Sequence, residues 1–302
     1  MGKIYHLYQT DAFTKKCFTG NPAGVITNAD GLSDLQMQQI ARELNNSETA
    51  FIFRKSGGDS DIQVRFFTPV REVPICGHAT IAAHYTYAME NHLPADCRIL
   101  QKTKAGILPV DICRKGNDYL ITMTQGDVQI GSPLSPEYQS MIVHALGLKK
   151  EDLRTDCPMV IASTGHSKVM VGIKNLKQLH SLQPDFAGLS RISEIIGCNG
   201  YYVFILDEGN TPLVHGRMFA PVIGIAEDPV TGNANGPLGA YLVHFGIADV
   251  HHGQFSFEAV QGEAIGRTGT MTVHVSVVDK KPVSVQISGN AVIVFSADLE
   301  LS

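Results

Sequence analysis

The sequence lacks the usual signatures of cofactor and metal sites. It contains no C-x-x-C pair, no H-E-x-x-H motif, no P-loop and no G-x-G-x-x-G motif. The sequence therefore shows no phosphate-binding loop for a nucleotide cofactor and no recognisable set of ligands for a zinc ion. No lysine stands in an obvious Schiff-base setting. We expect neither a metal nor a cofactor. The six cysteines without paired spacing fit free thiols in a reducing compartment, so we expect a cytoplasmic protein.

Strong net charge and long runs of leucine and isoleucine are missing as well. Charged residues make up 18% of the chain and the net charge is −5, which gives no basic field for nucleic acid. The two long uncharged segments, Val73–Met89 and Pro229–Ala248, are rich in glycine, proline, histidine and small residues, which argues against membrane spans. The N-terminus resembles a first strand and not a signal peptide. A small-molecule partner is the expectation.

Self-similarity divides the 302 residues into two halves, which suits two domains of about 150 residues each. The stretch RFFTPV, beginning at Arg65, returns as RMFAPV at Arg217. After a three-residue insertion in the second copy, further pairs regain register: Pro74 with Pro229, Gly77 with Gly232 and Ala79 with Ala234. The repeat predicts two similarly folded halves.

Each copy has the same order of expected elements: a strand, a Pro/Gly turn, an uncharged helix of small residues and a pair of strands. A helix that is apolar on every side is normally buried. We therefore expect an α+β fold of two pseudo-symmetric lobes, each a mostly antiparallel sheet or barrel wrapped around a central helix. The N-terminal lobe should span residues 1–128, with a strand at 287–302 returning to it, and the C-terminal lobe 129–286. The active site is expected in the cleft between them.

Amphipathic segments predict further, outer helices. One follows Ser33 and Gln36, which have the spacing of a capping box. Two others are expected at residues 135–148 and 174–197.

The repeated glycines, Gly77 and Gly232, stand where the two buried helices begin. Glycine lets a ligand approach the backbone closely, and a helix N-terminus offers unpaired N–H groups and partial positive charge. Two such helix ends would suit a small anionic substrate. The alternative is that the glycines only permit tight packing.

Glu48 lies between a polar turn, Asn45–Ser47, and an apolar strand. A carboxylate at the start of a buried strand is partly desolvated, which favours general acid–base chemistry. The alternative is a solvated loop glutamate or a cap for a neighbouring helix.

Cys76 and His78 allow several interpretations. A metal site needs further ligands, which the spacing of the sequence does not supply. A Cys/His hydrolase needs the two side chains to face each other, and neighbours two positions apart across a glycine rarely do so. Cofactor-free chemistry by acids and bases remains.

Four stretches resemble the PhzF family of phenazine biosynthesis: DAFTKKCFTGNPAGV, NNSETAFIF, VPICGHAT and EDPVTGNA. They come in the family's order, and the similarity extends along nearly all of the chain. The resemblance implies the two-lobed fold that this family shares with diaminopimelate epimerase. It also implies a homodimer.

The resemblance assigns roles to individual residues. The glutamate of the family's S-E-T motif, its proposed general acid–base, falls on Glu48. The Gly-His pair that holds the substrate falls on Gly77 and His78. The aspartate that contacts the amino-bearing region of the substrate falls on Asp228.

Two positions depart from the related patterns. The family's Gly-Ser pair falls on Gly232 and Asn233, and the asparagine argues against the phenazine precursor as substrate. Cys76 lies about where diaminopimelate epimerase has one of its two catalytic cysteines, but the other is replaced near Asp228. A symmetrical two-thiol racemase is therefore not supported, and Cys76 is either a secondary catalytic residue or a buried wall residue.

The sequence thus favours a cofactor-independent isomerase that moves a proton on a small, amino-bearing carboxylate, with Glu48 as general acid and base. Two alternatives remain open. One is a racemase or epimerase that uses Glu48 with Cys76 or Asp228. The other is a non-catalytic metabolite-binding or scaffold protein on the same fold.

Overall fold

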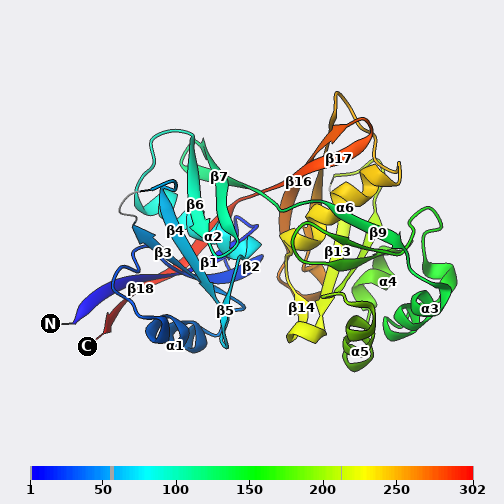
Figure 1. Ribbon diagram of the computed structural model, residues 1–302, viewed down its shortest axis with the longest axis horizontal. Coiled ribbons are helices and arrows are strands. Elements are labelled where there is room, and N and C mark those ends of the chain that lie inside the picture. Colours follow the sequence, from blue (N-terminus) through cyan, green and yellow to red (C-terminus); the bar gives the residue numbers. More distant parts are fainter. Residues whose placement is uncertain (1, 55–57, 212, 302) are drawn as a thin grey trace. The chain divides into compact units, whose positions relative to one another are not determined.

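The computed structural model describes residues 2–54, 58–211 and 213–301, which form two compact units (Figure 1). The N-terminal unit consists of Met1–Thr124 and Ser288–Ser302, and the C-terminal unit of Gln125–Ile287. No helix among the described residues is long and apolar enough to cross a membrane.

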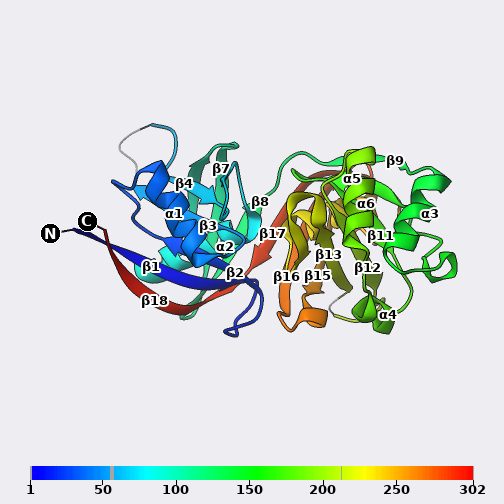
Figure 2. The same ribbon diagram turned by 90° about the horizontal axis from the view of Figure 1, so that it is seen from below.

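The N-terminal unit is a mostly antiparallel sheet around one helix. Its elements are β1 (Lys3–Ala12), β2 (Asn21–Ile26), α1 (Asp34–Leu44), β3 (Thr49–Arg54), β4 (Ile62–Phe67), β5 (Glu72–Val73), α2 (Gly77–Glu90), β6 (Cys97–Thr103), β7 (Gly106–Lys115), β8 (Asp118–Thr124) and β18 (Ala291–Leu301). The last strand, β18, lies antiparallel beside β1 (Figure 2). From β18 the pairing runs through β1, β2, β3, β4, β6, β7 and β8, with parallel pairs only at β2–β3 and β4–β6.

The C-terminal unit repeats this plan. Its elements are β9 (Gln129–Pro133), α3 (Pro136–Ala145), β10 (Val160–Ser163), β11 (Lys168–Gly172), α4 (Leu176–Ser181), α5 (Phe186–Ile196), β12 (Tyr201–Leu206), β13 (Val214–Ala220), β14 (Ile225–Asp228), α6 (Gly232–His244), β15 (Gln254–Gln261), β16 (Gly269–Val278) and β17 (Lys281–Gly289), together with the short 3₁₀ helices Lys150–Asp152, Pro221–Ile223 and Glu263–Ile265. The pairing runs through β9, β10, β11, β12, β13, β15 and β16, and the parallel pairs β11–β12 and β13–β15 stand at the equivalent places. The predicted α+β fold of two similar lobes is confirmed.

The helices α2 and α6 are the predicted central helices. Of the 14 residues of α2, all but Tyr87, Met89 and Glu90 are buried, and α2 packs against strands from both ends of the N-terminal unit, including β1, β2, β3, β8 and β18. In the C-terminal unit, α6 packs against β10, β11, β15 and β16. Helices without a polar face are stable here because sheet covers them on several sides.

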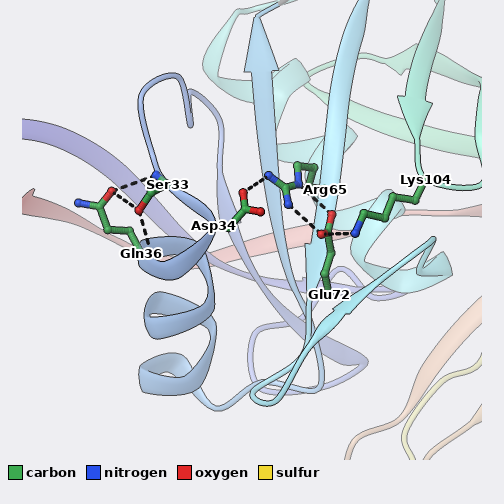
Figure 3. A network of polar contacts seen from close by, with 6 residues as sticks. All are labelled: Ser33, Asp34, Gln36, Arg65, Glu72 and Lys104. Atoms are coloured by element: carbon green, nitrogen blue, oxygen red, sulfur yellow. Dashed lines mark hydrogen bonds and ion pairs between the residues drawn. The ribbon is translucent and has the colours of Figure 1, made fainter.

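The outer helices follow local sequence signals. Ser33 and Gln36 form the predicted capping box at the start of α1: the Gln36 amide donates to Ser33 Oγ (3.3 Å) and the Ser33 amide donates to Gln36 Oε1 (3.0 Å) (Figure 3). The helix predicted at 135–148 is α3. The single helix predicted at 174–197 is wrong, because the chain forms α4 and α5 instead. Pro184 has no N–H for a continuous helix, and Asp185 caps α5 by accepting from the Gly188 amide at 2.9 Å.

The repeated arginines bind glutamates that stand at the same distance before each central helix. Arg65 of β4 holds Glu72 of β5 with two hydrogen bonds of 2.8 Å, and Asp34 and Lys104 complete a network (Figure 3). Arg217 of β13 holds Glu227 of β14 in the same way, at 2.9 and 2.7 Å. These pairs fix the hairpins that lead into α2 and α6.

The second arginine is the more deeply buried. Its side chain is 7% exposed, against 18% for Arg65. Its Nη1 also donates to the carbonyls of Leu179 and Leu182, both at 3.0 Å, so Arg217 links β13 to the chain around α4. Both guanidinium groups lie over a phenylalanine two residues on, Phe67 and Phe219, at 5.2 and 5.0 Å from the ring centroid.

Arg217→Met should lower the free energy of unfolding of the C-terminal unit by about 3 kcal/mol, because it leaves the Glu227 carboxylate buried without its counter-ion. Denaturant unfolding monitored by circular dichroism measures this. Arg191→Met is the matched control, since Arg191 is 70% exposed and 4.0 Å from Asp185. Equal stability of the two variants would contradict a structural role for the pair.

Candidate active site

Glu48 follows α1 and immediately precedes β3. The helix ends at Asn45, whose left-handed backbone (φ 52°) turns the chain back toward the sheet. The carbonyl of Glu48 then accepts from the Gly24 amide at 3.3 Å, where β3 joins β2. The side chain is only 14% exposed, so Glu48 is not a freely solvated loop residue.

His78 connects Glu48 to Cys76. Its Nε2 lies 3.5 Å from Glu48 Oε2 and 3.3 Å from Ser47 Oγ, and its Nδ1 lies 3.4 Å from Cys76 Sγ. His78 and Cys76 are both buried. A neutral imidazole donates from one nitrogen and accepts at the other, so His78 can hold a thiol on one side and a carboxylate on the other.

The expectation that Cys76 and His78 would not face each other is wrong. Cys76 is extended (φ −142°, ψ 128°), whereas His78 already lies in the first turn of α2. This change of backbone direction brings the two side chains to the same side of the glycine.

Glu48, Cys76 and His78 also bring three potential metal-ligand atoms within 4.8 Å of one another. Motif spacing could not reveal this set, because Glu48 comes from another element. However, Cys76 and Glu48 are approached by opposite nitrogens of the His78 ring, whereas a metal ion requires one nitrogen to point to the same centre as the other ligands. The geometry fits a hydrogen-bonded chain better than a metal site.

The corresponding turn of the C-terminal unit contains Asp228, at the end of β14. Asp228 is buried, and Thr231 Oγ1 donates a hydrogen bond to its Oδ2. Gln261 holds the turn, because its Nε2 donates to the Asp228 carbonyl at 2.7 Å and its Oε1 accepts from the Thr231 amide at 3.1 Å. Gly232 begins α6, and Asn233 Oδ1 accepts from Gln125 Nε2 at 3.3 Å.

The central helices differ from the outer ones at their N-termini. A side chain caps each outer helix: Ser33 for α1, Ser135 for α3, Asn175 for α4 and Asp185 for α5. Neither Cys76 nor Thr231 makes such a bond, and the hydroxyl of Thr231 donates to Asp228 instead. Amides at the starts of α2 and α6 therefore have no side-chain acceptor from the cap position, which suits an anion.

Packing does not require glycine at the two helix starts. A methyl group on Gly77 would meet only Met123 Sδ, at 3.9 Å, and one on Gly232 would meet Gln125 Nε2 at 3.5 Å. By contrast, a methyl group on Gly236, one turn into α6, would lie 1.7 Å from Gln125 Oε1. The packing explanation thus applies to Gly236, whereas a methyl group on Gly77 or Gly232 would make only ordinary van der Waals contacts. That these two glycines let a ligand approach the backbone stays a prediction.

Gly77→Ala and Gly232→Ala should therefore fold with wild-type stability, within about 0.5 kcal/mol, and lose affinity for a small carboxylate. Gly236→Ala should be destabilised, because its methyl group collides with Gln125. Thermal unfolding and calorimetric titration separate the two effects. Destabilisation of all three variants alike would show that packing selects glycine at every position.

Lys168 is a buried cation that the sequence reading missed. It is the first residue of β11 and only 3% exposed. Burial lowers its pKa to about 8, although Cys198 and Asp228 oppose this shift electrostatically. The available signal was a lysine directly before an apolar strand, in the stretch GHSKVMVG. Ser47, Thr231 and Gln261 were also missed, because only the fold brings them to their partners.

Lys168→Met should raise the free energy of unfolding at pH 7 by about 3 kcal/mol. The folded-state pKa of about 8 lies below the unfolded value of 10.5, so protonation favours the unfolded state and the charged lysine destabilises the fold. The difference between variant and wild type should shrink from pH 8 to pH 10.5 and then vanish. Denaturant titrations across this range test it, with the exposed Lys177→Met as control.

The family model that matches the chain is PhzC-PhzF, described as phenazine biosynthesis-like protein, over residues 10–297. An uncharacterised isomerase of Clostridium acetobutylicum is 60% identical over 303 residues, covering 100% of both chains. The uncharacterised isomerase YddE of Escherichia coli is 47% identical over 292 residues, covering 97% of each. A trans-2,3-dihydro-3-hydroxyanthranilate isomerase of Pseudomonas chlororaphis is 30% identical over 296 residues, covering 96% of this chain and 97% of its own.

Solved structures agree on the fold. A PhzF-family phenazine biosynthesis protein of Bacillus anthracis superposes with a TM-score of 0.88 at 32% identity, covering 99% of this chain and 100% of its own. A hydroxyproline epimerase of Agrobacterium vitis superposes with a TM-score of 0.62 at 12% identity, covering 100% of this chain and 94% of its own. The second likeness extends to the fold alone.

Proposed function

Because the chain belongs to the phenazine biosynthesis-like PhzC-PhzF family and is an isomerase, we propose that it moves a proton within a small, amino-bearing carboxylate, with Glu48 as general acid and base. Relatives named isomerases argue against the interpretation as a non-catalytic scaffold. The proposal needs no redox cofactor, since an isomerisation has no net oxidation or reduction.

The single observation that carries the proposal is the contact of Glu48 with His78. The Glu48 carboxylate is 14% exposed, and its Oε2 lies 3.5 Å from His78 Nε2. The contact orients the carboxylate, and its burial leaves little water to compete for its proton. In its ionised form Glu48 takes a proton from carbon, and the C–H bonding electrons shift into the adjacent unsaturated system. The protonated Glu48 then returns that proton to a second carbon, which restores the carboxylate.

Negative charge that develops during the transfer needs stabilisation. The uncapped N-termini of α2 and α6, at Gly77 and Gly232, supply amide donors and partial positive charge for a carboxylate or enolate. We assign substrate binding to these glycines together with His78, Asp228 and Asn233.

The substrate class is supported by the relative named trans-2,3-dihydro-3-hydroxyanthranilate isomerase, whose substrate is a ring carboxylate with an amino group. Asn233 stands where the family pattern has serine, which argues for a different substituent on the substrate of this chain. We therefore propose an amino-carboxylate, but not that compound itself.

A racemase or epimerase is the second candidate, and the contact between Cys76 Sγ and His78 Nδ1 favours it. At 3.4 Å, the imidazole could accept the thiol proton and make Cys76 a second base beside Glu48. Inversion at a stereocentre would then replace the shift of a proton between two carbons.

Glu48→Gln should fold normally and bind a small carboxylate, because the helix N-termini and His78 are unchanged. Exchange of a substrate C–H with solvent deuterium should fall at least about a hundredfold, since an amide cannot exchange the proton. Nuclear magnetic resonance in D₂O measures this exchange on an amino-carboxylate from a ligand screen.

Cys76→Ala is the matched variant on the other side of His78. It should keep exchange within about threefold if Glu48 is the only general acid and base. Loss of exchange in Cys76→Ala with near wild-type exchange in Glu48→Gln would replace the glutamate mechanism with thiol chemistry.

Activity should not depend on a metal or an organic cofactor. Dialysis against a chelator should leave deuterium exchange unchanged, and added zinc should inhibit it if the ion occupies Glu48, Cys76 and His78. Elemental analysis and absorption spectra of the purified protein check the same point. Activity that is lost with the metal and restored by it would refute cofactor independence.

The expected homodimer and cytoplasmic location stay predictions, and light scattering of the purified protein tests the first.

A further inference from the structure

Lys168 is a buried cation without a direct counter-ion. Its Nζ donates one long hydrogen bond, of 3.3 Å, to the Ser167 carbonyl, and it makes no ion pair with any residue in the described ranges. An ammonium group has three donors, so most of its capacity is unused. Burial of an unpaired charge opposes folding, and such a residue persists only where something other than stability retains it.

The strand directs Lys168 toward the central helix. Val169 and Val171 belong to the core beneath the outer helices, together with Leu179 of α4 and Leu189 of α5. Alternate residues of a strand point to opposite faces, so Lys168 and Gly172 lie on the face toward α6. Gly172 confirms this orientation, because a methyl group on it would lie 3.2 Å from Phe204, whose ring contacts Tyr241 of α6 edge-on.

The surroundings of Lys168 provide one carboxylate, but that carboxylate has another partner. Asp228 lies near enough to act on the lysine electrostatically, yet its Oδ2 accepts from Thr231, and no ion pair joins the two side chains. Asp228 also immediately precedes the turn into the uncapped start of α6. A cation and a carboxylate in the same region match the two charges of a zwitterion.

We propose that Lys168 binds the carboxylate of the substrate, and that the substrate class is therefore a zwitterionic amino-carboxylate. This assignment rests on the proposed function, in which Asp228 receives the amino group. The ion pair forms only when the substrate binds, which explains why Lys168 stays buried and lacks an acidic partner within the chain.

The test compares 2-aminocyclohexanecarboxylate, a ring amino-carboxylate that is zwitterionic at pH 7, with its carboxamide, which keeps the ammonium group and lacks the carboxylate charge. Wild-type protein should bind the carboxylate at least tenfold more tightly by calorimetric titration, and Lys168→Met should lose most of this preference and keep only the part that the helix N-termini supply. Lys177→Met, on the exposed face of α4, should keep the wild-type preference. Lys168→Met with an unchanged preference would overturn the proposal, and so would wild-type protein that binds the two probes equally or does not bind the carboxylate.

Amine labelling of wild-type protein provides a measurement that does not depend on the folding of a variant. Acetylation of Lys168, followed by mass spectrometry, should be slowed by the carboxylate probe and not by the carboxamide. Equal labelling with both probes would overturn the proposal. Glu48→Gln should keep the tenfold preference while losing deuterium exchange, so a failure of the glutamate mechanism and a failure of the lysine assignment give different results.

Discussion

The start of each central helix depends on one ion pair between an arginine and a glutamate. The arginine lies on the strand that ends before the turn, and the glutamate stands five residues before the first residue of the helix, at Glu72 before Gly77 and at Glu227 before Gly232. Two parallel hydrogen bonds fix the direction as well as the distance of such a pair. The hairpin is thereby held against the sheet, and the polypeptide enters α2 or α6 at a defined point.

The two units carry different side chains on this common skeleton. Cys76 and Thr231 occupy equivalent cap positions, and neither caps its helix, because the thiol faces His78 and the hydroxyl faces Asp228. A duplicated backbone has thus kept its structural ion pair and diverged in the side chains beside it. In the N-terminal unit Glu48, His78 and Cys76 form a chain of contacts, and in the C-terminal unit Lys168 and Asp228 bring charges of both signs together.

The repeat, the two buried helices and the capping box could be predicted because each depends on residues close together in sequence. The contact of Glu48 with His78 could not, since it depends on how β3 packs beside α2. The equivalence of Glu72 and Glu227 was visible in EVPICG and EDPVTG. A single shared glutamate does not predict an ion pair, however, because the sequence does not show that an arginine faces it. The break between α4 and α5 was also predictable, because Pro184 disfavours a continuous helix and Asp185 is a typical N-cap for the next one.

The long pairing of β1 with β18 has a consequence for synthesis on the ribosome. Lys3 pairs with Leu301, so β1 cannot pair with β18 until almost the entire chain has been synthesised. The C-terminal unit, by contrast, is one continuous segment, Gln125–Ile287. It can complete its sheet while the earlier residues still lack their last strand, and the nascent N-terminal unit meanwhile presents an unpaired edge that a chaperone can cover.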